Sequence, residues 1–214
     1  MPDTRRIFTQ EQIAAIEEGD EFRGCVFDGL SFYGQSLKEC VFEECSFEGA
    51  NLMMARLNAA TFHSCNLTGL RLAGASLFST TFERSKLLGV DLRDVESTTA
   101  AVFRECNLSL ACLRGVDLTA VDFERSSLME ADLAVAKLDE ASFSGADLSR
   151  VDVHGASLRQ TDLRGATLSG WSLTQPELRG AIMDRRQIEL LAAELGILVL
   201  DADEQPTRKR SRRR

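Results

Sequence analysis

The stretch from Ala146 to Gly165, ADLSRVDVHGASLRQTDLRG, consists of four five-residue units that share one pattern. Each unit begins with a small residue and has Leu or Val at its third position, with mostly polar residues between them. The same unit continues in both directions, with its third, central position running from Phe22 to Leu92 and again from Phe103 to Met183. Of these 32 central positions, 30 are Leu or Phe, so one repeat accounts for most of the chain.

A period of five is incompatible with a single straight strand or a single helix. Side chains on a strand alternate between two faces, so every fifth residue would point to the opposite face. Five residues on an α-helix advance by about 500°, which places successive central residues roughly 140° apart. The apolar residues stay inside only if the backbone turns once per unit. The repeat therefore predicts an all-β solenoid in which each coil covers its neighbours.

The spacing of phenylalanine gives the number of sides. One Phe column has steps of 20 residues with a single step of 21, and aromatic side chains favour such stacking. Twenty residues per coil and five per side predict a four-sided β-helix of about eight coils, about 38 Å long. We interpret the extra residue, which falls within Arg93–Val102, as a one-residue bulge or small loop. The column is Phe22, Phe42, Phe62, Phe82, Phe103, Phe123 and Phe143.

The N-terminal end of this rod needs a cap, because an open end exposes apolar side chains and unpaired backbone groups. Thr9 and Gln12 have the spacing of a capping box, while Phe8 and Ile13 have the spacing of a hydrophobic staple. We therefore predict a short helix from Thr9 to about Glu18 over the first coil.

A second cap is predicted at the C-terminal end. Asp184 and Gln187 repeat the capping box, and a helix over Arg185–Leu195 is expected to stop at Gly196. Ile197–Leu200 should follow as a short extended strand. Because one coil end cannot cover all the apolar side chains of this segment, we expect it to form a homodimer interface. The interface residues are Ile188, Leu191, Ala192, Leu195, Ile197 and Val199.

These assignments divide the chain into four parts. Residues 1–19 form the N-terminal cap, residues 20–183 form the β-helix, and residues 184–200 form the dimerisation module. Residues 201–214 are expected to be a disordered basic tail, because they are polar and hold six of the 25 basic side chains.

Charge is distributed unevenly between the body and the tail. Residues 1–206 carry 33 acidic and 19 basic side chains, a net of −14. Over a rod of about 38 Å this is about two-thirds of the charge density of duplex DNA. The body should therefore repel nucleic acid and attract basic surfaces, leaving the tail as the only expected nucleic-acid contact. No segment has the length or apolar character of a membrane span or signal peptide, so we expect a cytoplasmic protein without membrane contact.

Cysteine and histidine give little support for catalysis or metal binding. Five of the six cysteines occupy the small inward position, where a free thiol packs like a small apolar group. Cys112 is expected to point outward. His63 and His154 follow central residues on different sides, so they cannot assist one nucleophile. We expect no enzymatic activity, no cofactor and no metal site.

Outward aspartates directly precede many central residues, and two interpretations remain open for them. Their side chains can hold each turn by bonding to nearby backbone, and together they can form an acidic surface. The residues assigned to that surface are Asp117, Asp122, Asp132, Asp147, Asp152 and Asp162.

Units such as Ala146–Arg150, Ala156–Gln160 and Thr161–Gly165 resemble those of the pentapeptide-repeat proteins. This resemblance implies a right-handed quadrilateral β-helix. The C-terminal helix and apolar segment look like the Qnr and MfpA type within that family. The type implies a homodimer that mimics DNA, binds DNA gyrase or topoisomerase IV, and confers resistance to fluoroquinolones or similar poisons.

A different class of function remains open beside this one. The same rod would serve as a structural scaffold, or as a toxin-immunity protein, with another protein partner. The chain has no long insertion that forms a surface loop, so inhibition of a topoisomerase and its protection from a poison also remain alternatives.

Overall fold

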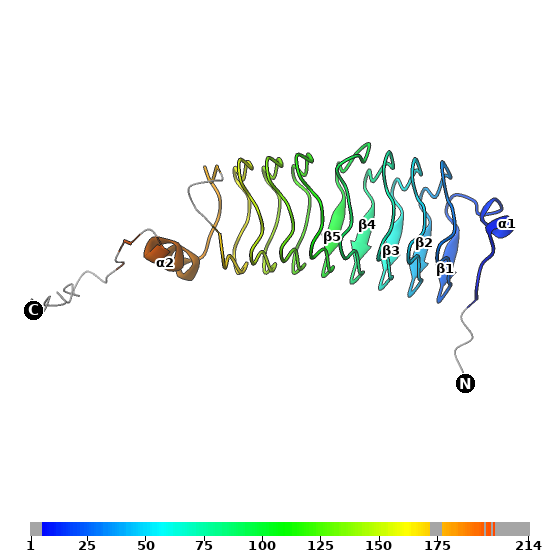
Figure 1. Ribbon diagram of the computed structural model, residues 1–214, viewed down its shortest axis with the longest axis horizontal. Helices are drawn as coiled ribbons and strands as arrows, with labels where there is room; N and C mark the ends of the chain where they lie inside the picture. The colour runs from blue at the N-terminus through cyan, green and yellow to red at the C-terminus, as the bar shows by residue number, and fades with distance from the viewer. Residues whose placement is uncertain (1–5, 172–176, 195, 198, 200–214) are drawn as a thin grey trace, which may run out of the picture.

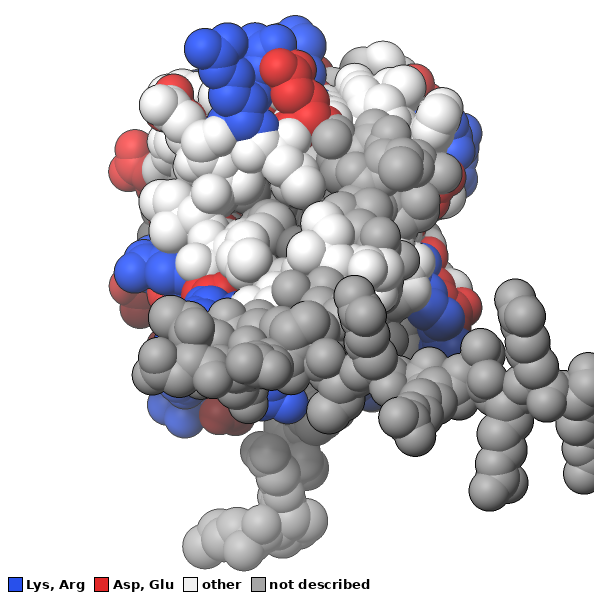
Figure 2. Space-filling view, turned by 90° about the vertical axis from the view of Figure 1, so that its left-hand side faces the viewer, with Lys and Arg blue, Asp and Glu red and all other residues white. Residues whose placement is uncertain are grey.

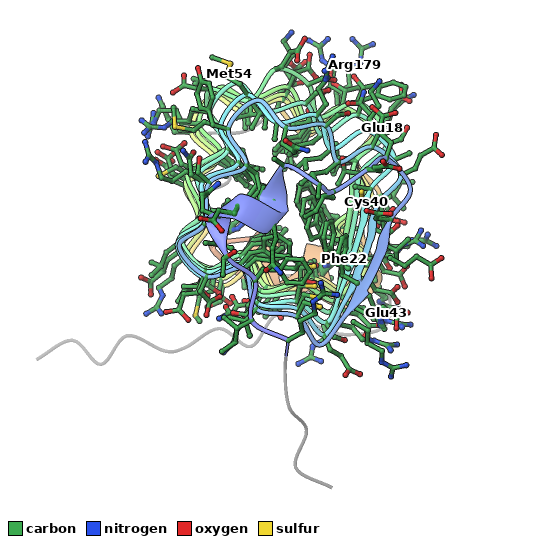
Figure 3. The ribbon with its side chains drawn as sticks, turned by 90° about the vertical axis from the view of Figure 1, so that its right-hand side faces the viewer. Glu18, Phe22, Cys40, Glu43, Met54 and Arg179 are labelled. Carbon is green, nitrogen blue, oxygen red and sulfur yellow. The ribbon has the colours of Figure 1, made fainter. Side chains whose placement is uncertain are left out.

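A four-sided rod is formed by the repeat, with residues 6–20 at one end and residues 185–194 at the other (Figure 1). The computed structural model describes residues 6–171, 177–194, 196, 197 and 199. Viewed along its axis, the chain follows a square outline with side chains filling the centre (Figure 3). We name the sides A to D by their first central residues, which are Phe22, Phe27, Phe32 and Leu37. The predicted solenoid fold is confirmed.

Side A contains one parallel sheet with the strand order β1-β2-β3-β4-β5. Each strand pairs with the next in a register of 20 residues, or 21 between β4 and β5. The five strands span four steps from one coil to the next, whereas the repeat predicted about eight coils. Isolated parallel bridges continue the same register as far as Asp162 and Ile182. The strands are β1 (Glu21–Arg23), β2 (Val41–Glu43), β3 (Thr61–His63), β4 (Thr81–Glu83) and β5 (Val102–Arg104).

The predicted phenylalanine column runs through the core along side A. From Phe22 to Phe143, successive rings stack with centroids 4.9–5.3 Å apart and interplanar angles of 16° or less. Phe27 and Phe47 start a second stack on side B at 4.7 Å. The spacing of the rings matches the spacing of paired strands, so each coil adds one ring to the column.

Small inward residues also hydrogen-bond between coils. Ser85 Oγ donates to the carbonyl of Phe62, and Ser126 Oγ donates to that of Phe103, each 23 residues earlier. Cys65 Sγ makes the same contact with Phe42. A hydroxyl or thiol at this position satisfies a buried carbonyl, which explains why Ser, Thr and Cys replace Ala there.

Nearly every described corner places one residue in the left-handed backbone region, which a turn of this kind requires. Glycine occupies many of these corner positions, as Gly155 does with φ of 66°. Seventeen other residues adopt the same conformation. Val135 is the most strained of these, because a β-branched side chain is disfavoured at its φ of 53°.

A single extra residue, Glu96, produces the predicted bulge. Glu96 N donates to the carbonyl of Ala75, while Leu77 N donates to the carbonyl of Ser97. Glu96 and Ser97 therefore both lie opposite a single residue of the preceding coil, as in a β-bulge. Thr98 takes the central position in this unit and is buried. The bulge therefore lengthens the chain by one residue without shifting the coils that follow.

The N-terminal cap differs in extent from the prediction. Helix α1 (Gln10–Ile13) is much shorter than the predicted helix to Glu18, although the capping box at Thr9 is present. Its end is set by packing, because Ile16 turns into the core. Before the helix, Ile7 pairs with Val26 and extends the ladder of side B, which the repeat pattern did not predict.

At the other end, α2 (Arg185–Glu194) begins as predicted. Asp184 N donates to the side chain of Gln187, and Gln187 N donates back to Asp184. Gly196, with φ of 73°, follows the helix as expected. The predicted strand is not seen at Ile197 or Val199, and the tail from residue 201 lies outside the described residues.

Replacing Val135 by glycine should stabilise the protein, because glycine adopts the left-handed conformation without a steric penalty. We expect a gain of about 1 kcal/mol and a rise in Tm of about 2–4 °C. Val135→Ala removes nearly the same side chain but keeps Cβ, so it should recover less of the strain. An unchanged or lower Tm for Val135→Gly in thermal unfolding would show that the corner is not strained.

Candidate protein-interaction surfaces

The six aspartates assigned to an acidic surface do not lie together. Asp122 and Asp162 are on side A, whereas Asp132 and Asp152 are paired neighbours on side C, the opposite side. The remaining two occupy the other sides, because Asp147 pairs with Ser127 on side B and Asp117 with Lys137 on side D. A partner that contacts one side of the rod would therefore meet at most two of the six.

Each of these aspartates holds its own turn. Asp147 Oδ1 accepts a hydrogen bond from Ser149 N at 3.0 Å, and Asp132 Oδ1 accepts one from Ala134 N at 3.0 Å. The other four make the same bond to the residue two positions later, at 2.9–3.2 Å. The turn-holding interpretation of these residues is confirmed.

Most of the same carboxylates also form ion pairs, which weaken their outward field. Arg104 pairs with Asp122 at 2.6 Å, and Arg114 bridges Asp132 and Asp152 at 2.8 and 3.4 Å. Asp117 pairs with Lys137, and Asp162 with Arg164. The hydrogen bond from Arg164 lowers the pKa of Asp162, and the one from Thr119 lowers the pKa of Asp117.

Negative charge is instead concentrated toward the N-terminal end. Residues 21–183 carry 22 acidic and 15 basic side chains, a net of −7, so only half of the −14 of residues 1–206 lies on the coils. Residues 6–64 alone contain ten acidic and four basic side chains. Glu18 and Glu43 lie toward one flank of this end (Figure 3). The aspartate pattern missed this region because its acids are mostly Glu at varied positions; counting charge in windows would have found it.

Three neighbouring acids at the N-terminal end form no ion pair within the described part of the chain. Glu21 is on side A, Glu39 occupies the corner between sides D and A, and Glu17 is in the cap beside that corner. The carbonyl of Glu17 accepts a hydrogen bond from the thiol of Cys40, which fixes the cap to this corner. These three carboxylates form what we call the N-terminal acidic corner, and no described cation forms an ion pair with them.

The C-terminal end is the second candidate surface. Gln187 is buried, and its amide donates to the carbonyls of Leu163 and Ala166, which fixes α2 to the last coil. Ile188 is 50% exposed and Leu190 is 61% exposed on the same helix. The helix therefore docks through a polar anchor and leaves large apolar side chains uncovered.

Several residues of the predicted dimer interface are accessible at this end. Ile197 is 55% exposed, Val199 is 48% exposed and Ala192 is half-buried. The side chain of Leu191 and the whole of Leu195 lie outside the described residues. Charged side chains lie at the rim of this end of the rod, with uncharged ones across its middle (Figure 2).

A cavity of about 620 Å³ lies between part of α2 and the end of the rod, beside the Gln187 anchor. Leu168 lines it from the last coil, while Leu190 and Ala193 line it from the helix. Leu168 is a central residue, yet it is only partly buried because no further coil covers it. The open end is thus incompletely filled by the residues that the structure describes.

The cysteines occupy the positions expected of them. Cys106 and the other four inward cysteines are buried, and burial raises the pKa of Cys106 to about 12. Cys112 is partly exposed. His63 is only half-exposed, and its Nε2 is buried with no hydrogen-bond partner among the described residues. Within the described residues no helix could cross a membrane, and no three His, Cys, Asp or Glu side chains are grouped to bind a metal ion.

Comparison with known proteins gives two kinds of match. A family model described as "Pentapeptide repeat region" matches residues 20–92. A second, described as "Pentapeptide repeats (8 copies)", matches residues 99–119, 126–165 and 154–185. No curated protein sequence matches this chain.

Solved structures of QnrB1, described as a plasmid-mediated fluoroquinolone resistance protein, are similar over most of their length. A trypsin-treated variant of QnrB1 is 25% identical, with a TM-score of 0.81, over 86% of this chain and 91% of that chain. The full-length form is 24% identical, with a TM-score of 0.80, over 90% of this chain and 95% of that chain.

Substitutions at Asp147 should separate turn support from charge, because this residue has a turn bond but no ion pair in the described part of the chain. Asp147→Asn keeps the acceptor for Ser149 N and should leave Tm unchanged. Asp147→Ala removes the acceptor and should cost about 1 kcal/mol, measured by thermal unfolding. Equal Tm values for the two variants would contradict turn support.

Proposed function

This chain belongs to the pentapeptide-repeat family, and from this premise we propose that it binds a bacterial type II topoisomerase, DNA gyrase or topoisomerase IV. It would do so as a DNA mimic, modulating the enzyme and lessening the action of fluoroquinolones or similar poisons on it. The observation that carries the proposal is the similarity to QnrB1, a fluoroquinolone resistance protein, over 86% of this chain and 91% of that one.

The shape and charge of the rod support this proposal. A type II topoisomerase must hold duplex DNA on a basic surface, and such a surface also attracts a rigid acidic rod. The described acids that form no ion pair offer the strongest attraction, because an ion pair within the rod competes with one to the partner. The N-terminal acidic corner, rather than the paired aspartates of the later coils, is therefore the proposed contact.

We further propose that two chains pair through their C-terminal ends. Four apolar side chains are exposed at that end: Ile188, Leu190, Ile197 and Val199. Exposed apolar surface of this kind marks a protein interface, because its contact with water is unfavourable. A two-fold pairing would cover them and would also close the cavity beside Leu168. It would place the two N-terminal acidic corners at the far ends of a rod roughly 80 Å long.

Neutralising the N-terminal acidic corner should weaken the effect on the topoisomerase. We expect the triple variant Glu17→Gln, Glu21→Gln, Glu39→Gln to inhibit supercoiling by purified DNA gyrase with roughly tenfold lower potency than wild type. The assay is run with and without a fluoroquinolone and at rising salt. Wild-type potency should fall as salt rises, because exposed charges are screened.

A matched control removes the same charge elsewhere. Asp94, Glu140 and Asp147 also form no ion pair in the described part of the chain, so the variant Asp94→Asn, Glu140→Gln, Asp147→Asn should retain most of the potency. Equal losses in both triple variants would exclude a specific acidic contact. Absence of any effect of wild type on gyrase and topoisomerase IV would refute the proposed function and favour a scaffold or immunity role.

The dimer is tested separately. Ile188→Arg places a charge in the apolar end without touching Gln187, so it should give a folded monomer. Light scattering at micromolar concentration measures the mass, and Glu189→Gln on the same helix serves as the control. A monomeric wild type would contradict the proposal, as would an Ile188→Arg variant that remains dimeric.

A further inference from the structure

Strand β1 is the N-terminal edge of the sheet on side A, and among the described residues it pairs only with β2. Each later strand bonds to the strand before it through its first and third residues, as when Val41 N donates to the carbonyl of Asp20. The same positions in β1 are Glu21 and Arg23, so their two N–H donors and two carbonyls face outward. Of these four groups only the Arg23 carbonyl has a contact in the described part of the chain, a 3.4 Å bond from the thiol of Cys25.

The N-terminal cap covers the first coil on the other three sides but not on side A. On side B, Ile7 continues the ladder by pairing with Val26. On side C, the side-chain amide of Gln10 bonds to both backbone groups of Ser31, at 2.7 and 2.8 Å. On side D, the turn before β1 donates one bond, from Gly19 N. No described backbone group of the cap bonds to β1.

The burial of β1 shows that this edge is open. Glu21 and Arg23 are exposed and Phe22 is only partly buried, whereas the central residue of every later strand is fully buried. Phe8 meets the ring of Phe22 edge-on, with centroids 5.6 Å apart, so the stacked column ends at Phe22. In the view onto this end of the rod, β1 lies along one flank and α1 over the centre (Figure 3). The edge therefore offers main-chain groups beside an incompletely covered apolar side chain.

The charge around this edge favours a basic segment. Residues 17–23 carry four acidic side chains and one basic side chain. The basic one, Arg23, lies 3.9 Å from Glu43 and 3.5 Å from Glu44, so its charge is already offset. Glu21 lies on the edge itself and belongs to the N-terminal acidic corner, which has no ion pair with a described cation. Lys or Arg beside this edge therefore gains an attraction that an acidic segment would not.

We propose that β1 is the docking edge for an extended basic segment of the partner, which adds to the sheet by main-chain hydrogen bonds. Side chains alternate along such a segment, so an apolar residue faces Phe22 while a neighbouring Lys or Arg faces outward beside Glu21. The identity of the partner, a type II topoisomerase, rests on the proposed function. The inference adds the form of the contact: the acidic corner attracts the segment, and the strand edge fixes its register.

The test is an NMR titration of the isotope-labelled full chain, at low salt, with the peptide acetyl-Thr-Lys-Leu-Lys-Thr-amide. Lys on both sides of Leu places one cation beside Glu21 in either strand direction. We expect Kd on the order of millimolar and shift changes at the amides of Glu21, Arg23 and their neighbours. The matched peptide with Glu in place of both Lys should bind at least about tenfold more weakly.

Two variants at one position separate main-chain bonding from charge. Arg23→Pro removes an outward N–H donor and leaves the acidic corner intact, and proline is tolerated in an edge strand. Arg23→Ala removes the same cation but keeps the donor. We expect Arg23→Pro to bind the Lys peptide, and to inhibit supercoiling by DNA gyrase, roughly tenfold more weakly than Arg23→Ala. The comparison of the two peptides on wild type decides the question even if Arg23→Pro does not fold.

Four results of the titration would overturn the proposal. They are equal binding of the two peptides, equal binding by the two Arg23 variants, shift changes confined to residues away from β1, and no response of wild type up to about 10 mM peptide. A response that appears only after deletion of residues 1–5 would assign the edge to the chain's own first residues instead.

Failure of this inference is distinct from failure of the proposed function. If wild type inhibits gyrase and Arg23→Pro is as potent as Arg23→Ala, the proposed function stands and the strand contact is refuted. If wild type affects neither gyrase nor topoisomerase IV, the proposed function fails, and the peptide titration alone decides whether β1 binds a basic strand.

Discussion

Backbone hydrogen bonds between successive coils hold all four sides of the rod, and every other feature depends on their 20-residue register. A coil cannot bury its central residue alone, because only the coils before and after it cover that residue. The Phe column shows the result, with one ring added per coil at 4.9–5.3 Å. Each five-residue unit thus supplies one buried side chain for its side and one turn for its corner.

The same register decides which outward residues can interact. A carboxylate before a central residue is already used by its own turn, as Asp132 is by Ala134 N. It also lies beside a residue 20 positions away, so a cation there or nearby pairs with it, as Arg114 does with Asp132 and Asp152. An acidic sequence therefore does not produce an evenly acidic rod. Charge without an ion pair among the described residues includes the three carboxylates of the N-terminal acidic corner, whereas on the later coils it is spread over separate positions such as Asp94, Glu140 and Asp147.

The two ends of the rod are closed in different ways, and this difference bears on function. The N-terminal cap continues the ladder, with Ile7 pairing to Val26 and Ile13 and Ile16 buried over the first coil. The C-terminal helix is anchored by one buried side chain, Gln187, and leaves a cavity and exposed apolar residues. The acidic end underlies the proposed contact with a partner, and the apolar end underlies the proposed pairing of two chains.

The sequence by itself determined the four-sided solenoid, the Phe column, the inward cysteines, the one-residue bulge and the capping box before α2. These follow from spacing, and spacing is a local property that the chain carries whatever it contacts. Only the tertiary structure decided that the six aspartates lie on four different sides, that α1 ends at Ile13, and that the cap leaves the edge of β1 open. Each of these depends on which segments meet across neighbouring coils. A repeat specifies that residues 20 positions apart are adjacent, but it does not specify whether their charges cancel or whether every backbone group finds a partner.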